Sequence, residues 1–274
     1  MSIFLNGNII DYGYLITLDM KIFSINVISI FGYLIIGVFF PLLWLQGMRL
    51  KREVPRLPTP GDRPFGIWKG KDKEFNILGL GESPMAGVGI AKYAFTLTGL
   101  TAVRLNKLLG CCVNWRILAE SGLNLKNLNK LIGEQSDENA DLVLVSMGGN
   151  DVFQLTPPWI WKNNINTCVK LLFHNDIKPL ILFSPVPPVG RFPAIPNPLR
   201  IVFGFWEFLL QASLAQVIDS MDNAHLLDER FPDGKEYYLK DGIHPSPLAY
   251  DPWSEKLAIM TIELLNQKKL GMHD

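Results

Sequence analysis

A serine, a histidine and an aspartate are placed in this sequence as a hydrolytic triad requires. Ser83 follows an apolar run that ends at Gly81, and Asp241 and His244 lie three residues apart near the C-terminus. Serine is a poor nucleophile at neutral pH and needs a base, usually histidine, which a carboxylate orients. A single turn can hold the Asp241 carboxylate against one imidazole nitrogen and leave the other for Ser83. The sequence therefore predicts Ser83 as nucleophile, His244 as base and Asp241 as the orienting acid.

Acyl transfer by a serine also needs hydrogen-bond donors for the developing oxyanion. The candidates are the backbone N–H of Ser83, the backbone N–H of Gly122 and the side-chain amide of Asn150. Glycine at position 122 suits close approach of the backbone to a ligand. Taken singly, these residues have ordinary explanations, with Ser83 as a helix N-cap and Asn150 in a turn. The order and placement of the whole set favour a site.

Two binding classes fit the sequence poorly. Gly79 and Gly81 begin a dinucleotide fingerprint, but its next glycine position holds Pro84, and no Gly-Lys-Ser/Thr of a P-loop occurs. The 26 basic residues are balanced by 26 acidic ones, which argues against a nucleic-acid-binding protein.

Short apolar runs that alternate with helical patterns must position these residues. Such alternation, with strands apolar enough to be buried on both faces, predicts a parallel α/β sheet covered on both sides. The carboxyl ends of parallel strands meet at one edge, where function collects. Strands are predicted at 75–81, 112–119, 141–151, 178–188 and 224–228, and helices at 88–110, 125–135, 158–175, 200–221 and 247–269.

The same blocks resemble the SGNH/GDSL hydrolase superfamily of serine esterases and lipases over roughly residues 75–265. The resemblance implies a three-layer α/β/α flavodoxin-like sandwich with a five-stranded parallel sheet, without metal or cofactor. It also implies a Ser83–His244–Asp241 triad, with Ser83, Gly122 and Asn150 as oxyanion donors. The matching blocks are Gly81-Glu82-Ser83-Pro84-Met85-Ala86-Gly87, Gly122, Gly148-Gly149-Asn150-Asp151 and Asp241-Gly242-Ile243-His244.

One residue departs from the family pattern, because Glu82 stands where the family has aspartate. The longer side chain is expected to change how the nucleophile turn is braced, and with it the rate and substrate preference. The main hypothesis is a carboxylic ester hydrolase acting on a small-molecule or lipid-like ester. Two alternatives stay open: an acyltransferase or O-deacetylase acting on a glycan or lipid with the same triad, and a non-catalytic binding module.

Two features near the site have two interpretations each. The stretch 185–211 is rich in proline and bulky apolar residues, so it either walls an acyl-binding pocket or forms a loop and a core helix. Met85 either lines the pocket or packs beneath the nucleophile turn.

The N-terminal part of the chain is predicted to enter a membrane. No charged residue occurs from Ile22 to Met48, a stretch of 27 residues. As a helix it spans about 40 Å, more than the ~30 Å hydrocarbon core of a bilayer. A cleaved signal peptide fits less well, because the run is long and no small-residue cleavage site follows it. Basic residues gather after the run, so the positive-inside rule predicts a single-pass protein with a cytoplasmic catalytic domain.

The sequence thus divides into four predicted parts. These are an N-terminal segment at 1–21, a transmembrane helix at 22–48, a basic and proline-rich linker at 49–72, and a hydrolase domain at 73–270. Three cysteines are too few for a disulfide framework.

Overall fold

A computed structural model describes residues 3–5, 8–10, 12–135, 139–173, 178–227 and 231–270, and within these ranges the side chains from Ile25 to Gln267 except that of Asp72. Within these residues, six strands form the main sheet in the order β3-β5-β4-β6-β7-β8. Five of them are parallel: β4 (Lys71–Gly81), β5 (Cys111–Ala119), β6 (Leu142–Ser146), β7 (Leu180–Phe183) and β8 (Ala224–Leu226). The predicted parallel strands are therefore confirmed.

The sixth strand corrects the prediction of a five-stranded sheet. β3 (Phe65–Trp68) pairs antiparallel with β5 at the sheet edge, within the predicted linker. It is four residues long and alternates exposed with half-buried positions. Its residues are apolar or glycine at every position, so they show no alternation of polar and apolar side chains, and four of them beside a proline-rich stretch are too few to be told from a loop.

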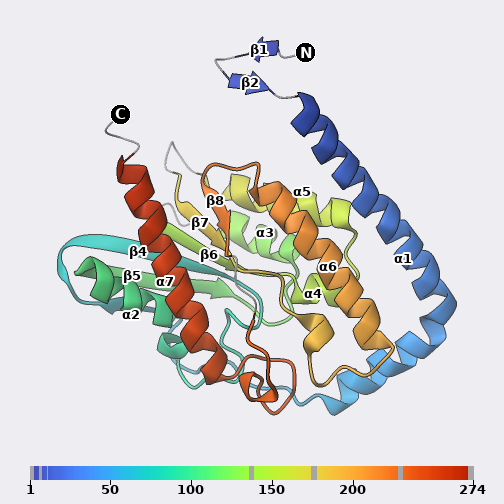
Figure 1. The fold of residues 1–274 in the computed structure, drawn as a ribbon. Helices are drawn as coiled ribbons and strands as arrows, with labels where there is room; N and C mark the ends of the chain where they lie inside the picture. The colour runs from blue at the N-terminus through green and yellow to red at the C-terminus, as the bar shows by residue number, and fades with distance from the viewer. Residues whose placement is uncertain are drawn as a thin grey trace.

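Helices cover both faces of the sheet, as predicted (Figure 1). On β6, Val143 and Val145 face one helix layer, whereas Leu142 and Leu144 face the other. This burial on both faces explains the uninterrupted apolar run of the strand. One layer holds α3 (Leu125–Glu134), α5 (Pro158–Leu171) and α6 (Leu199–Ile218), and the other holds α2 (Leu97–Leu109) and α7 (Pro247–Leu270).

The helix predicted at 88–110 begins later than expected. Residues 82–89 form successive turns, a short 3-10 helix covers Tyr93–Phe95, and α2 starts at Leu97. Gly87 and Gly89 adopt positive φ angles of 70° and 78°, a conformation that suits turns rather than a helix. α2 ends at Gly110, which adopts the left-handed conformation typical of a helix C-terminus.

The N-terminal helix is longer than the predicted 22–48. α1 runs from Tyr12 to Glu53, after a small hairpin of β1 (Ile3–Leu5) and β2 (Asn8–Ile10). It continues through Pro41 and runs beside α6 along the side of the molecule (Figure 1).

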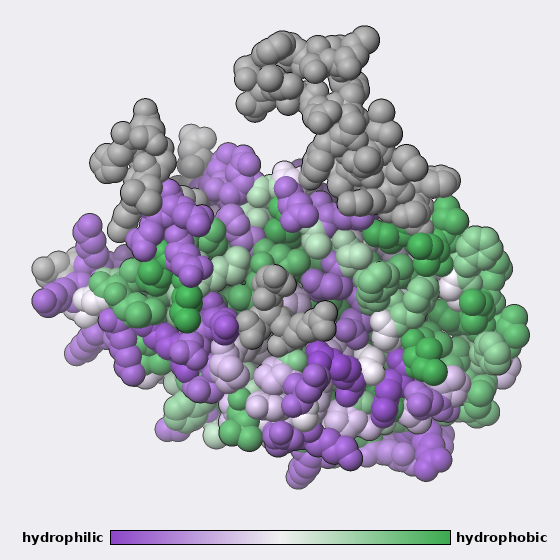
Figure 2. All heavy atoms as spheres, in the orientation of Figure 1, coloured by the Kyte–Doolittle hydropathy of each residue, from purple (hydrophilic) through white to green (hydrophobic). Residues whose placement is uncertain are grey.

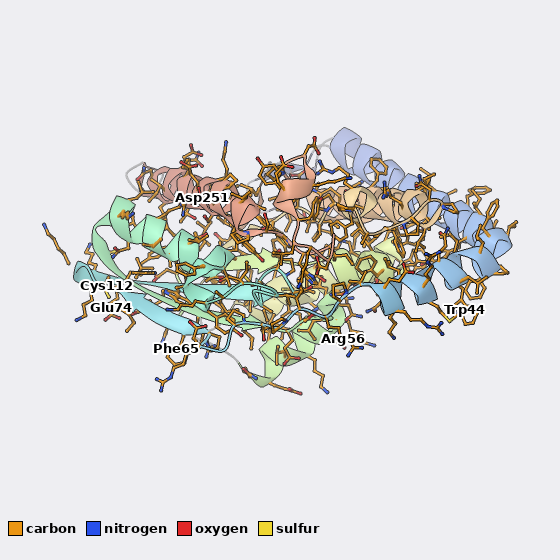
Figure 3. The ribbon with its side chains drawn as sticks, turned by 90° about the horizontal axis from the view of Figure 1, so that it is seen from below. Trp44, Arg56, Phe65, Glu74, Cys112 and Asp251 are labelled. Carbon is orange, nitrogen blue, oxygen red and sulfur yellow. The ribbon has the colours of Figure 1, made fainter. Side chains whose placement is uncertain are left out.

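The proline-rich segment between α1 and β3, residues 54–64, is extended, and it is bound to the domain. Figure 3 shows Arg56 on this segment, between Trp44 of α1 and Phe65 of β3. The Pro58 carbonyl accepts a hydrogen bond from Gly89 N (2.7 Å), and the Asp62 carboxylate accepts one from Tyr93 N (3.1 Å). The segment therefore packs on the turns that follow the predicted nucleophile.

Candidate active site

The predicted nucleophile, Ser83, lies on a crowded turn just beyond β4. A Cβ at Gly81 would lie 2.5 Å from the Ser146 carbonyl oxygen, so only glycine fits where the turn begins. On the other side, the buried Tyr250 hydroxyl of α7 donates to the Pro84 carbonyl at 2.8 Å. The turn is thus held between the sheet and α7, and Ser83 is half-buried.

Met85 packs beneath this turn, which decides between its two interpretations. Its side chain is fully buried, and its Sδ accepts a hydrogen bond from Thr98 Oγ1 at 2.9 Å.

Asp241 and His244 form the pair that their spacing predicts. Asp241 Oδ2 lies 2.5 Å from His244 Nδ1, and Asp241 Oδ1 accepts the N–H groups of Ile243 (3.0 Å) and His244 (3.1 Å). Burial of the carboxyl acts to raise the pKa of Asp241, but these hydrogen bonds outweigh it and hold the pKa below its ordinary value. The carboxylate therefore stays ionised and fixes the imidazole orientation.

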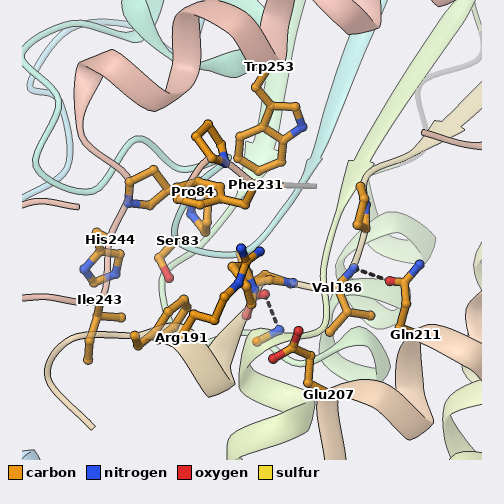
Figure 4. Close-up of a pocket in the computed structure, with 18 of the residues that line it drawn as sticks. Ser83, Pro84, Val186, Arg191, Glu207, Gln211, Phe231, Ile243, His244 and Trp253 are labelled. Atoms are coloured by element: carbon orange, nitrogen blue, oxygen red, sulfur yellow. Dashed lines mark hydrogen bonds between the residues drawn. The ribbon is translucent and has the colours of Figure 1, made fainter. Parts of the chain in front are cut away.

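Ser83 and His244 face one cavity of about 820 Å³ (Figure 4). No hydrogen bond joins Ser83 Oγ to the His244 ring in the described part of the chain, and His244 Nε2 has no partner there. The structure thus brings a hydroxyl, an oriented imidazole and an ionised carboxylate to one chamber. Such a set can transfer a proton away from a serine as it attacks a carbonyl.

Glu82 also lines this chamber, and it braces the segment that holds Asn150. Its buried carboxylate accepts Gly149 N (2.7 Å), Asn150 N (2.9 Å) and the Asn150 side-chain amide, all from α4 (Gly149–Phe153). Burial raises the pKa of Glu82 to about 7, against the opposing effect of these hydrogen bonds. At the position where this sequence departs from the family pattern, Glu82 therefore links the nucleophile turn to Asn150, a predicted oxyanion donor.

The three predicted oxyanion donors differ in their surroundings. None of the described groups accepts the N–H of Ser83. The Asn150 amide lines the cavity, but besides Glu82 it also donates to the Leu123 carbonyl at 3.0 Å, which engages both of its hydrogens. Gly122 lies in the exposed turn after β5 with φ of 90°, outside the residues that line the cavity.

Asp151, the last residue of the Gly-Gly-Asn-Asp block, has a bracing position that sequence reasoning did not assign. Its buried carboxylate accepts Leu125 N (2.9 Å) and Thr156 Oγ1 (3.0 Å). Burial raises the pKa of Asp151 to about 6, whereas these hydrogen bonds act to lower it. Asp151 thereby ties the start of α3, which follows the Gly122 turn, to α4.

The stretch 185–211 contributes both to the core and to the wall of the cavity, while binding of an acyl group there stays a prediction. On α6, Trp206, Leu209 and Leu210 are fully buried in the core. The other side of the stretch walls the cavity, through Pro185, Val186, Pro187, Pro188, Arg191, Phe192, Glu207, Phe208 and Gln211.

Sequence reasoning missed two polar residues of this wall. Gln211 Oε1 accepts Val186 N at 2.7 Å (Figure 4), and Glu207 Oε2 accepts Gly190 N at 2.9 Å. Burial raises the pKa of Glu207. Their spacing of four residues on an otherwise apolar helix was the available signal, since it places both on one helix face.

Comparison with protein families identifies the chain. Residues 80–251 match the model of the GDSL-like Lipase/Acylhydrolase family, which is more than half of the sequence. The chain belongs to this family. As a GDSL-family protein it is an enzyme of the ester hydrolase class, and none of the curated proteins compared matches it.

Solved structures share the fold of this GDSL-family chain. The lipase Lip_vut3 from a goat rumen metagenome is 20% identical with a TM-score of 0.53, covering 67% of this chain and 95% of its own. A family 3 carbohydrate esterase from Clostridium thermocellum is 17% identical with a TM-score of 0.54, covering 71% and 98%. Est24, a carbohydrate acetylesterase from Sinorhizobium meliloti, is 17% identical with a TM-score of 0.51, covering 69% and 99%.

Proposed function

We propose that this GDSL-family enzyme hydrolyses carboxylic esters with Ser83 as nucleophile, His244 as general base and Asp241 as the orienting acid. The observation that carries the proposal is the Asp241–His244 contact of 2.5 Å at the wall of the cavity that also holds Ser83. Asp241 binds Nδ1–H, so the neutral imidazole presents Nε2 as the proton acceptor.

The reaction proceeds in two halves. Ser83 Oγ attacks the ester carbonyl as its proton passes to His244 Nε2, and Asp241 stabilises the resulting imidazolium. The imidazolium then gives this proton to the departing alcohol, which leaves an acyl group on Ser83. Water, deprotonated by the same imidazole, attacks the acyl-enzyme, and the proton returns to Ser83 as the acid is released.

The oxyanion formed in each half is bound by the free N–H of Ser83 and by the Asn150 amide. Asn150 donates one hydrogen to the Glu82 carboxyl and the other to the neutral Leu123 carbonyl. Above the Glu82 pKa of about 7 its carboxylate is charged, and bonds to a charged acceptor are the stronger ones. The hydrogen on Leu123 is therefore the one that turns to the oxyanion. The Gly122 N–H joins these donors through a shift of its exposed turn.

The enzyme is held at a membrane through α1. The most apolar 18-residue window within residues 25–53 of this helix has a mean hydropathy of 2.3. α6 is the second described helix that is apolar and long enough to cross a bilayer, and 44% of its apolar window is buried inside the protein. Arg49, Lys51 and Arg52 follow the charge-free stretch, so the proposal places the catalytic domain on the cytoplasmic side.

The proposed triad is tested with the full chain in detergent. Wild type is expected to hydrolyse p-nitrophenyl butyrate and to be labelled by a fluorophosphonate probe. Ser83→Ala should lose both activities and His244→Ala should lose turnover, whereas the control Ser220→Ala, an exposed serine at the end of α6, should keep both. Turnover by the Ser83→Ala variant equal to that of wild type would refute the proposal.

A further inference from the structure

The outer faces of α1 and α6 form one exposed apolar surface, here called the α1–α6 surface. On α6 it consists of Ile201, Phe205 and Phe208, which are 66%, 36% and 65% exposed and lie on one helix face. Figure 2 shows hydrophobic residues gathered where α1 runs beside α6. On α1 the surface contains Ile28, Ile30, Phe31, Leu34, Ile35, Val38, Phe39, Phe40, Leu42, Trp44 and Leu45.

Specific contacts hold the two helices together over much of their length. The Tyr33 hydroxyl donates to the Leu155 carbonyl at 2.6 Å, and the Tyr33 ring packs edge-on against Trp206 at 4.6 Å. Further along, Gln46 donates to the Asn197 carbonyl (2.8 Å) and accepts Leu199 N (3.1 Å). These contacts are 13 residues apart on α1, or about 20 Å along a helix. The outer faces of α1 and of the first half of α6 therefore lie side by side.

The packing of α1 against α6 is close enough to require a small residue. A Cβ at Gly32 would lie 2.8 Å from Phe205 Cε1. Phe205 thus contacts α1 with one part of its ring and leaves another part exposed beside that helix, so the apolar faces of the two helices are continuous.

The charges of α6 are directed away from this surface. Its two charged residues are Arg200 and Glu207. Arg200 donates to the Ile195 carbonyl at 2.7 Å, and Glu207 accepts Gly190 N beside the cavity. A large uncharged surface of this kind marks an interaction site. Because the exposed basic residues Arg49, Lys51 and Arg52 lie at its end, it suits a bilayer with anionic headgroups.

Phe208 belongs both to this surface and to the cavity. It is 65% exposed on the outer side of α6, and it lines the chamber that contains Ser83 and His244. We propose that the α1–α6 surface lies against a lipid bilayer and that the cavity opens toward the lipid at Phe208. An acyl chain of a membrane-borne ester then passes from the bilayer to Ser83. The bilayer contact stands independently of the chemistry, whereas the route of the acyl chain rests on the proposed function.

Photocrosslinking tests the bilayer contact. The full chain carrying p-benzoylphenylalanine at Ile201 is reconstituted into phosphatidylcholine–phosphatidylglycerol vesicles that contain a clickable phospholipid. The matched control carries the probe at Ile67 on β3, which is 65% exposed against 66% for Ile201. Several-fold more lipid adduct from position 201 than from position 67 supports the proposal. Equal lipid labelling at the two positions, or adducts of position 201 only with a second copy of the chain, overturns it.

Kinetics test the route of the acyl chain. Ile201→Asp should lower turnover of a long-chain ester embedded in these vesicles several-fold, because the charged side chain opposes contact with lipid. Turnover of soluble p-nitrophenyl butyrate should not change, and Ile67→Asp should leave both reactions unchanged. An equal loss on both esters, or no loss on the embedded ester, overturns the route. Crosslinking in the Ser83→Ala background separates the two proposals, since lipid adducts need no catalysis.

Discussion

The buried carboxyl of Glu82 makes the stability of this enzyme depend on pH. Its pKa is raised from 4.5 to about 7 by burial. A group whose pKa is higher in the folded state contributes stability that is complete below the unfolded pKa and is lost as the pH rises through the folded pKa. The contribution of Glu82 is therefore complete below about pH 4.5 and is lost by about pH 8. The shift of roughly 2.5 pKa units corresponds to a loss of about 3 kcal/mol.

The Glu82→Gln variant isolates this contribution. Glutamine keeps the side-chain length and one acceptor oxygen but cannot ionise, so mismatches with the N–H groups of Gly149 and Asn150 cost the same free energy at every pH. We expect the difference in unfolding free energy, wild type minus Glu82→Gln, to fall by about 2.5 kcal/mol between pH 5 and pH 8. Asp151, with its pKa raised to about 6, contributes with the same sign, but it is present in both proteins and largely cancels.

The measurement is urea unfolding of the full chain in detergent, followed by tryptophan fluorescence at several pH values. Glu74→Gln, at an exposed position on β4, is the matched control for the loss of a carboxylate outside the core. If the difference for Glu82→Gln does not change with pH, Glu82 does not titrate in this range. If it grows with pH, the three N–H donors outweigh burial, and the argument is wrong.

Three further substitutions test the site. Asp241→Asn should lower kcat on soluble esters roughly 10⁴-fold with KM nearly unchanged, because the amide no longer fixes the His244 tautomer; steady-state kinetics would show it, and a loss below tenfold would argue against the triad. Gly81→Ala should destabilise the chain by about 1–3 kcal/mol or more, because its methyl group has no space beneath the turn; unchanged urea midpoints would contradict the crowding. Tyr250→Phe should cost about 1–3 kcal/mol, since the Pro84 carbonyl loses a buried donor, and stability equal to wild type would show that this bond is dispensable.

The strands that could be predicted are those whose burial leaves a mark on composition. β6 is buried at every position because both faces are covered, so its apolar run at 142–145 stands out, whereas the four residues of β3, half of them exposed, are too few to be told from a loop. Likewise the contact between Asp241 and His244 could be predicted, because the two residues are three apart in the sequence and a single turn brings their side chains together. The grip of Glu82 on Asn150 depends on the pairing of β4 with β6, which places Gly81 opposite Ser146. A single sequence does not specify that register. Glutamate in place of the family's aspartate therefore predicted that the nucleophile turn is braced differently, but it did not identify Asn150 as the residue that Glu82 contacts.

The proline-rich segment at 54–64 limits how the catalytic domain can move relative to α1, the proposed membrane helix. A free linker of 11 residues would let a domain wander over roughly 20 Å and tumble beneath its anchor. Here the Pro58 and Asp62 contacts hold the segment against the turns that follow Ser83, so the segment has little freedom to move relative to the domain. The catalytic chamber therefore keeps a fixed position and orientation relative to α1. With α1 in a membrane as proposed, the distance of an ester group from the membrane surface would select substrates together with the shape of the chamber.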